Sequence, residues 1–300
     1  MNPRLTHILK RIPLLRKTFH LYLLVKERHY KRLHLKFINH ANRFNSINYN
    51  FSKEVTFVEN LKIILDLKNF YEWRIYNSFL GRKDLEAETF SVLFDTLHEG
   101  DIFIDVGANL GIFTLLASRR VGHSGKVICF EPSLMTYRRL VQNVRLNSLK
   151  NIIPYRLGIS SKFEIKKLYK IKGSHDLSSM YKMGEEFEIV QNVNLDAIPV
   201  PKPVKLIKID CEGCELNALL GAQKLISNSP SMRVVMEFNP DYSGKELFNY
   251  LRTNFNIYGL EKVRSTHIKY SRINDVLGVN SANIMCERKD TTRTIIDPSS

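Results

Sequence analysis

Short apolar runs alternate with segments of helical periodicity from residue 102 onward. Such a run predicts a buried strand, and apolar residues three or four positions apart predict a helix with one buried face. We expect seven strands, at 102–106, 126–130, 151–157, 204–209, 233–238, 255–260 and 282–286. Helices are expected at 112–120, 133–147, 215–226 and 244–254. This order predicts a doubly wound α/β fold on a mostly parallel sheet, with one of the last two strands antiparallel because no helix separates them.

Two hairpins are expected outside this alternation. Residues 163–169 and 187–195 each have a strand-like pattern and are separated by a polar loop at 173–184. They predict a β-hairpin insertion within the α/β domain. Residues 55–67 predict a second hairpin with its turn at Glu59-Asn60.

The N-terminal part of the chain predicts a basic helical extension. Residues 8–42 contain no glycine and one proline, and a further helix is expected at 84–98. Residues 1–43 hold eleven Lys or Arg and one acid, so they carry +10 of the net +15, and the remaining chain carries only +5. The apolar positions at helical spacing are Leu14, Thr18, Leu21, Tyr22, Val25 and Leu33. Two interpretations stay open: a helix on an anionic membrane surface, or a helix docked on the protein with a solvated basic face.

Charge, hydropathy and cysteine content limit the binding partners and the cellular compartment that we expect for the protein. Because the positive charge is concentrated at one end, the main domain is not expected to bind nucleic acid. The longest run without a charged side chain is 106–118, whereas a membrane-spanning helix needs about 20 apolar residues. Four cysteines and no recognisable secretion signal indicate a reducing compartment. We expect a cytoplasmic protein that the basic extension can hold peripherally at a membrane.

The segment Asp105-Val106-Gly107-Ala108-Asn109-Leu110-Gly111 has the features of a nucleotide-binding loop. It joins a predicted strand to a predicted helix, where doubly wound folds bind nucleotides. Gly107 lets a ligand approach bare backbone, and Gly111 lets the helix lie close to the strand. Glu131 ends the next strand, where an acid can accept both hydroxyls of an adenosine ribose. The alternative is an ordinary strand-to-helix turn.

Pyrophosphate is a poor match for this loop. The chain contains no G-x-G-x-x-G and no Walker-type pattern. Asp105 would also repel pyrophosphate, whereas an acid attracts a cation. S-adenosylmethionine carries two cationic groups, an ammonium and a sulfonium, and is therefore the better candidate ligand.

The sequence resembles the FkbM-type class I methyltransferases. The matching elements are, in order, the loop 105–111 with Thr114, Phe130-Glu131-Pro132, Asn143 and Asn147, Leu157-Gly158-Ile159-Ser160, Leu195-Asp196, Lys208-Ile209-Asp210-Cys211-Glu212-Gly213-Cys214-Glu215, Gly221-Ala222, and Glu237. They lie within roughly 55–240, and 208–215 is the most family-specific segment. Cys211 and Cys214 occupy positions where the family has small or apolar residues.

The resemblance implies a seven-stranded, Rossmann-like methyltransferase sheet and methyl transfer from S-adenosylmethionine, commonly to a hydroxyl of a glycan or a small natural product. The residues implied to contact the cofactor are Asp105, Gly107, Asn109, Gly111, Glu131, Gly158 and Asp210. The first four would line its methionine end, Glu131 would hold the ribose, Gly158 would lie near the adenine, and Asp210 would close the site. We therefore expect an O-methyltransferase with a small-molecule or glycan acceptor.

A hydroxyl acceptor must lose a proton, and Asp210 and Glu212 are the candidates for the base. Glu212 and Glu215 can also be explained as acids that stabilise the first turn of a helix. Alignment of the acceptor without a strong base is a further alternative. His175, in the insertion loop, is another candidate base, and the competing explanation is a plain surface loop.

No metal is predicted. Asp210, Glu237 and Asn239 together would suit Mg²⁺, which some O-methyltransferases use, but no spacing in the chain demands a divalent metal. Cys211 and Cys214 form one C-x-x-C pair, and a structural zinc site usually needs four ligands. We expect two free thiols.

Two other functions remain open at this point. A nicotinamide-dependent oxidoreductase would share the strand, glycine loop, helix and acid, but the pyrophosphate glycines are missing. A nucleic-acid methyltransferase could use the basic N-terminus, but no Asn/Asp-Pro-Pro-Tyr motif occurs in the chain. We expect a methyltransferase domain at 51–289 between the extension at 1–50 and a polar tail at 290–300.

Overall fold

The computed structural model describes residues 29–36, 38, 51–80, 87–170, 178–179, 186–201, 203–211, 213–238, 244–264, 267–273 and 282–289. These residues fall into two compact units. The first consists of the described residues of Met1–Thr56 and Ile63–Leu85, and the second of those of Phe57–Lys62 and Glu86–Ser300. The domain boundaries expected at residues 50 and 289 stay predictions. No helix in these ranges is long and apolar enough to cross a membrane.

The first unit contains the expected N-terminal hairpin and a helix that was not expected. Strands β1 (Ser52–Thr56) and β2 (Lys62–Asp66) form a two-stranded sheet, as predicted. Helix α3 (Phe70–Phe79) follows. Asn69 caps it, because its side-chain oxygen accepts hydrogen bonds from the backbone amides of Tyr71 and Glu72. An asparagine before a helix is a start signal that the sequence analysis overlooked.

The described part of the basic extension is helical at residues 29–36, as expected, but it buries a different side chain. His34 is only 7% exposed, and its Nε2 lies 2.9 Å from the carbonyl oxygen of Leu67. The His34 ring also packs against Phe70 and Trp73. Leu33, expected in the apolar stripe, is 39% exposed, so that prediction is wrong. The carbonyl oxygen of Leu67 and the two aromatic rings provide partners for the imidazole at this buried position. A pattern of apolar residues does not register such partners and therefore gave no sign that His34 would be buried. The other stripe positions lie outside the described residues.

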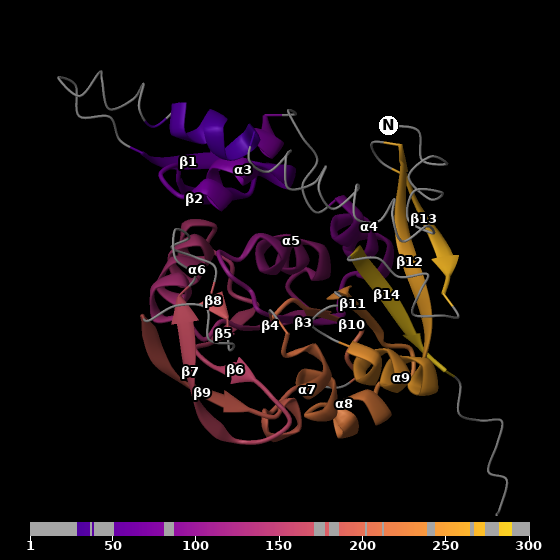
Figure 1. Cartoon of the computed structure of the whole chain (residues 1–300). Helices are drawn as coiled ribbons and strands as arrows, with labels where there is room; N and C mark the ends of the chain where they lie inside the picture. The colour runs from indigo at the N-terminus through magenta and orange to yellow at the C-terminus, as the bar shows by residue number, and fades with distance from the viewer. Residues whose placement is uncertain are drawn as a thin grey trace, which may run out of the picture. The chain divides into compact units, whose positions relative to one another are not determined.

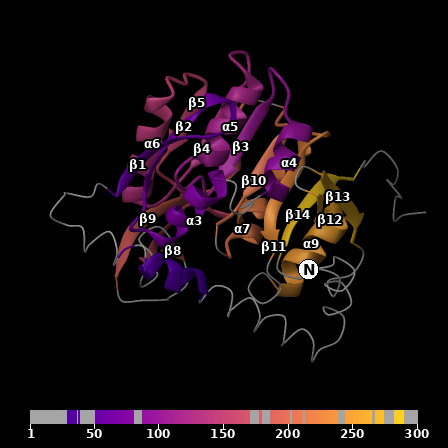
Figure 2. The same cartoon turned by 90° about the horizontal axis from the view of Figure 1, so that it is seen from above.

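The second unit is built on an eight-stranded sheet with the order β13-β12-β14-β11-β10-β3-β4-β5 (Figure 2). The strands are β3 (Ile102–Val106), β4 (Lys126–Phe130), β5 (Ile152–Tyr155), β10 (Leu206–Ile209), β11 (Arg233–Phe238), β12 (Phe255–Arg264), β13 (His267–Arg272) and β14 (Ala282–Arg288). Strands β5, β4, β3, β10 and β11 are parallel, and β14 is antiparallel to both β11 and β12. The mostly parallel sheet and the antiparallel late strand are therefore confirmed.

One strand of this sheet was missed. Strand β13 pairs antiparallel with β12 at the edge of the sheet, so the sheet has eight strands where seven were expected. An edge strand of an antiparallel pair needs apolar residues on one face only. Its sequence, His-Ile-Lys-Tyr-Ser-Arg, alternates in this way and lacks the continuous apolar run that identified the buried strands.

Helices cover both faces of the sheet (Figure 1). Helices α4 (Ala87–Thr96), α5 (Ile112–Val121) and α6 (Leu134–Leu146) pack on one face. Helices α7 (Glu215–Leu220), α8 (Gln223–Ser227) and α9 (Gly244–Asn254) pack on the other. Strand β3 supplies both cores, because Ile102, Ile104 and Val106 face one layer of helices and Phe103 faces the other.

The single helix expected at 215–226 is instead two short helices, α7 and α8, separated at Gly221-Ala222. A Cβ on Gly221 would lie 2.1 Å from the carbonyl oxygen of Ser160, so the chain passes directly against another backbone segment here. The carboxylate of Asp196 then accepts hydrogen bonds from the backbone amides of Lys224 and Leu225 at the start of α8. Tertiary contacts therefore impose the break, which helical periodicity alone does not reveal.

The insertion forms a separate four-stranded sheet with the order β6-β9-β7-β8. Its strands are β6 (Gly158–Ile159), β7 (Glu164–Lys170), β8 (Ser178–Ser179) and β9 (Phe187–Val193), and the antiparallel pairing of β7 with β9 confirms the predicted hairpin. Ser160 Oγ donates a hydrogen bond to Glu164, and the backbone amide of Leu134 donates one to Glu188. His175 lies outside the described residues.

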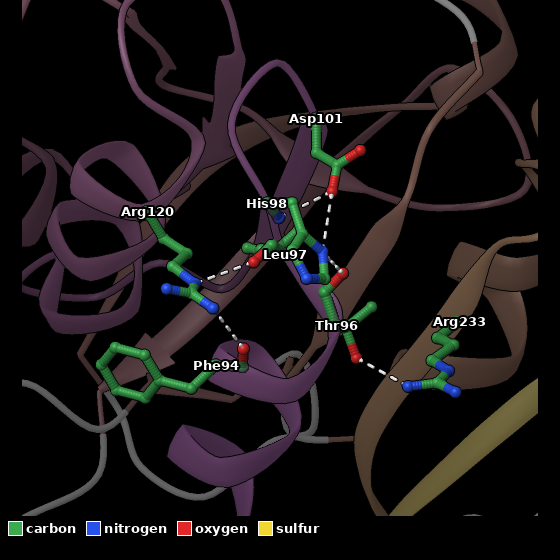
Figure 3. A network of polar contacts seen from close by, with 7 residues as sticks. All are labelled: Phe94, Thr96, Leu97, His98, Asp101, Arg120 and Arg233. Atoms are coloured by element: carbon green, nitrogen blue, oxygen red, sulfur yellow. Dashed lines mark hydrogen bonds and ion pairs between the residues drawn. The ribbon is translucent and has the colours of Figure 1, made fainter.

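A polar network secures the end of α4 near the amino ends of the central strands (Figure 3). Arg120 donates hydrogen bonds to the carbonyl oxygens of Leu97, at 2.8 Å, and Phe94, at 3.1 Å. Arg233 of β11 donates one to the hydroxyl of Thr96, at 3.2 Å. The last carbonyls of a helix have no partner within it, so Arg120 replaces missing hydrogen bonds, and Arg233 holds the Thr96 side chain at the same helix end.

We expect Arg120→Ala to lower the free energy of unfolding by about 1–3 kcal/mol, because it leaves two carbonyl groups without their donor. Arg119, its exposed neighbour on α5, is the matched control, and Arg119→Ala should change stability by less than about 0.5 kcal/mol. Urea denaturation of both variants measures the difference. Equal stability of the two variants would show that the network contributes nothing.

Candidate functional site

The loop after β3 lies at the carboxyl ends of the parallel strands, where the sequence placed it. Gly107 has a φ of 76°, and the backbone amides of Gly107 and Ala108 both donate hydrogen bonds to the carbonyl oxygen of Phe130 at the end of β4. A Cβ on Gly107 would lie 1.9 Å from the carbonyl oxygen of Asp210, which follows β10. Glycine is required here by backbone conformation and by lack of space.

Glu131 is joined to this loop by hydrogen bonds. Its Oε2 accepts from the backbone amide of Asn109 and its Oε1 from that of Ser133, each at 3.0 Å. A carboxylate has about four acceptor positions, so each oxygen can accept one more hydrogen bond. Glu131 is 8% exposed, and burial raises its pKa to about 7 despite the two amide donors, which lower it. The ionised form that accepts hydrogen bonds from a ribose thus becomes dominant only above neutral pH.

Asp105 is completely buried behind the loop. Its Oδ2 accepts a hydrogen bond of 2.6 Å from the hydroxyl of Thr114, and its Oδ1 lies 3.7 Å from Lys208 Nζ. Burial raises the pKa of Asp105, and the charge of Lys208 opposes this shift. Since no part of Asp105 reaches the solvent, its direct effect is on Thr114, on Lys208 and on the electrostatic potential of the loop.

Lys208 connects two of the expected site residues, a role that sequence reasoning missed. Its Nζ lies 3.1 Å from Asp210 Oδ2, and the residue is only 5% exposed. The ammonium also lies 5.1 Å from the centre of the Phe113 ring. The signal was a lysine inside an otherwise apolar buried strand, which needs charged partners to be stable there. With both carboxylates ionised the triad carries a net charge of −1, which favours a cationic ligand.

The structure brings Asp105, Gly107, Asn109, Glu131 and Asp210 together through these contacts. The contacts described above do not include the other three expected site residues, Gly111, Gly158 and Glu212. Gly111 lies against α6, where a Cβ on it would lie 2.6 Å from Leu140 Cδ1. Its role is therefore wider than the contact between helix and strand that the sequence suggested. Gly158 is buried in β6 and pairs with Asn192 of β9. Glu212 lies outside the described residues.

The site fits the cofactor that the sequence suggests. Asp105 Oδ1 and Asn109 Oδ1 are buried acceptors with no hydrogen-bond partner among the described residues. S-adenosylmethionine offers ammonium and hydroxyl donors, which such acceptors can bind. Gly107, Asn109, Glu131 and Asp210 would hold it, with Asp105 and Lys208 behind them.

A metal site has less support. Within the described ranges, no group of three or more His, Cys, Asp or Glu side chains is arranged to hold a metal ion. Asn239, the third ligand considered for Mg²⁺, lies outside those ranges. Cys211 and Cys214 are free, half-buried thiols.

Gly107→Ala should abolish measurable binding of S-adenosylhomocysteine, because the added methyl group would overlap the Asp210 carbonyl oxygen. Gly100→Ala is the matched control, since Gly100 also has a positive φ but its Cβ would come no closer than 3.7 Å to a neighbour. That variant should lose about 1–2 kcal/mol of stability and keep its affinity. Calorimetric titration and thermal unfolding of both variants check this, and wild-type affinity in Gly107→Ala would contradict it.

The raised pKa of Glu131 predicts pH-dependent binding. A protonated carboxyl loses acceptor capacity, so affinity for S-adenosylhomocysteine should fall by about tenfold from pH 8 to pH 6, as for one group with a pKa near 7. Glu131→Gln should bind more weakly and show no such dependence, because an amide does not titrate. Calorimetry across this pH range measures both proteins. A wild-type affinity that is constant with pH would refute the role given to this carboxylate.

Comparison with known proteins supports the interpretation of the loop. Hexuronic acid methyltransferase AglP of Haloferax volcanii is 30% identical over 160 residues, which cover 50% of this chain and 59% of that protein. Methyltransferase sdnD of Sordaria araneosa is 26% identical over 163 residues, covering 43% of this chain and 62% of that protein. The chain thus spans about 60% of the length of these curated relatives.

Similarity to solved structures is found at low sequence identity. An S-adenosylmethionine-dependent O-methyltransferase from Thermotoga maritima is 14% identical, with a TM-score of 0.42, over 81% of this chain and 88% of that one. The Methyltransferase FkbM domain matches residues 105–262, just over half of the chain, and its range contains both β3 with its loop and Asp210. The chain therefore belongs to the FkbM family of S-adenosylmethionine-dependent methyltransferases.

Proposed function

We propose that this protein is an O-methyltransferase whose acceptor is a hydroxyl of a glycan or a related small molecule. The observation that carries this proposal is the similarity to hexuronic acid methyltransferase AglP, which includes 50% of this chain. Family membership supports methyl transfer and leaves the nicotinamide-dependent oxidoreductase without support. The experiments below identify the sugar and the atom that is methylated.

Asp210 is the best-placed base for a hydroxyl acceptor. S-adenosylmethionine supplies an electrophilic methyl group, so the protein must align the acceptor oxygen and take up its proton. The Asp210 side chain is 40% exposed, and Lys208 fixes its orientation through Oδ2. Its other oxygen, Oδ1, makes no hydrogen bond within the described part of the chain and is available to a hydroxyl. Glu212 remains a second candidate.

We also infer a cytoplasmic location, with residues 1–43 held at an anionic membrane surface. The charge of this segment supports the inference, and its described helix exposes Lys31, Arg32 and Lys36. Segments with several basic residues bind anionic lipids by electrostatic attraction. The same charge would also attract nucleic acid, so RNA belongs in any test of the acceptor.

The acceptor is tested by incubating the full chain with isotopically labelled S-adenosylmethionine and a panel of hexuronic acid glycans, neutral glycans and RNA. We expect label in the hexuronic acid glycans, as a methyl ether by NMR. Label in RNA alone, or a methyl ester in place of the ether, would overturn the proposal.

Asp210→Asn tests the base on whichever glycan is methylated. Loss of a general base should lower kcat by about 100-fold or more with a smaller change in KM. Asp101→Asn, at the amino end of β3 and away from the cofactor loop, is the matched control and should keep wild-type kcat. A kcat in Asp210→Asn within a factor of about three of wild type would assign catalysis to alignment or to Glu212.

A further inference from the structure

The hairpin of β7 and β9 (Figure 1) presents an apolar face to the solvent. Side chains alternate between the two faces of a strand, and Leu168 and Val190, at inward positions, are buried. The outward positions are Ile165, Lys167, Tyr169, Phe187, Ile189 and Gln191. Four large apolar side chains on this face and just before it are 44–63% exposed, namely Phe163, Ile165, Phe187 and Ile189. A cluster of exposed apolar side chains of this kind marks a binding surface.

The register of the hairpin makes these outward side chains one continuous surface. The directly opposed pairs are Ile165 with Gln191, Lys167 with Ile189, and Tyr169 with Phe187. The ring centres of Tyr169 and Phe187 are 5.8 Å apart, and Lys167 Nζ lies 4.0 Å from the centre of the Phe187 ring. At a rise of about 3.3 Å per residue, the face extends about 13 Å from Ile165 to Tyr169. It therefore suits a flat, extended ligand.

The charge of this face favours an anionic partner. Lys167 is charged, and no acid occupies an outward position of β7 or β9. A second copy of the chain is a poor match, because a two-fold contact would bring the same face, with its lysine and no acid, against itself. A lipid surface is also a poor match, since lipid-binding clusters contain about four to eight basic residues.

The hairpin is fastened next to the cofactor site. Glu188, on the inward side of β9, accepts a hydrogen bond of 3.1 Å from the backbone amide of Leu134 at the start of α6. The preceding residue, Ser133, donates its amide hydrogen to Glu131. A ligand docked on the hairpin is therefore held close to the residues that would bind the ribose of the methyl donor.

We propose that this face docks a chain of hexuronic acid residues, so that the protein selects acidic glycan chains over single sugars. The proposal rests on the proposed function and names its acceptor more closely. A sugar ring has a face of C–H groups that can pack on the aromatic and aliphatic side chains. The carboxylate at the edge of the ring can pair with the ammonium of Lys167, and hydroxyls can bond to the amide of Gln191.

The test measures binding of a hexamer of galacturonic acid to the full chain by calorimetry, with the methyl ester of the same hexamer as the uncharged comparison. Lys167→Gln should weaken binding of the acid hexamer about fivefold and leave the ester unchanged, because it removes the charge alone. Phe187→Ala should weaken binding of both hexamers about tenfold, because it removes the ring on which the sugars pack. A single galacturonic acid should bind more weakly than the hexamer.

Two substitutions away from these strands are the matched controls. Lys150→Gln changes an exposed lysine before β5, and Leu80→Ala changes an exposed apolar side chain of the first unit. Both should bind the two hexamers as wild type does. All four variants should keep the wild-type affinity for S-adenosylhomocysteine, which verifies that the fold and the cofactor site are intact.

The variants are needed because the basic residues 1–43 also attract the acid hexamer. Hexamer binding that is equal in wild type, Lys167→Gln and Phe187→Ala would overturn the proposal. It would also be overturned if Phe187→Ala kept hexamer binding but lost binding to phosphatidylglycerol vesicles or lost self-association, which would assign the face to lipid or to a second copy.

These readouts measure binding alone and are separate from methyl transfer. A hexamer that binds through the hairpin but accepts no methyl group would reject the proposed acceptor and support the docking face. Methylation of hexuronic acid glycans at the wild-type rate and KM in both hairpin variants would reject the docking face and keep the proposed function.

Discussion

The contact between Gly107 and the Asp210 carbonyl oxygen is the constraint on which the candidate site depends. It lets the ends of β3 and β10 approach so closely that no side chain fits between them. These strands are neighbours in the sheet, with Asp105 directly opposite Lys208. The same register therefore places a buried ammonium between two carboxylates. Asp105 and Lys208 need each other, because an isolated charge at either buried position would be costly.

The parallel core was predictable because its strands are buried on both faces and read as continuous apolar runs. Strand β11 and helix α9 have the predicted limits, and the loop after β3 could be found because glycine and acid are required at fixed places there. Glu131 was predictable for the same reason, since it ends the adjacent strand. Its bonds to the amides of Asn109 and Ser133 were not, because they depend on the conformation of two loops.

The elements that were missed depend on contacts between distant residues. Gly221 interrupts a helix because Ser160 lies against it, and the sequence near Gly221 contains no trace of that neighbour. His34 replaces an expected leucine at a buried position because Leu67 and two rings provide its partners. Lys208 was visible as an anomaly within an apolar strand, but its partners became clear only from the pairing of β10 with β3. Helix α3 differs, since its Asn69 cap was present in the sequence and was overlooked.

The position of β14 has a consequence for how the chain reaches its folded state. This strand is the last of the described strands, yet it lies inside the sheet, between β11 and β12. A nascent chain that has been synthesised only as far as β13 has no partner for that side of β11, and its β12–β13 hairpin is not joined to the rest of the sheet. The parallel half, by contrast, has all its strands once β11 has left the ribosome. Completion of the domain must then await the final strand, so the exposed edge of β11 is a point of vulnerability to misassembly during biosynthesis.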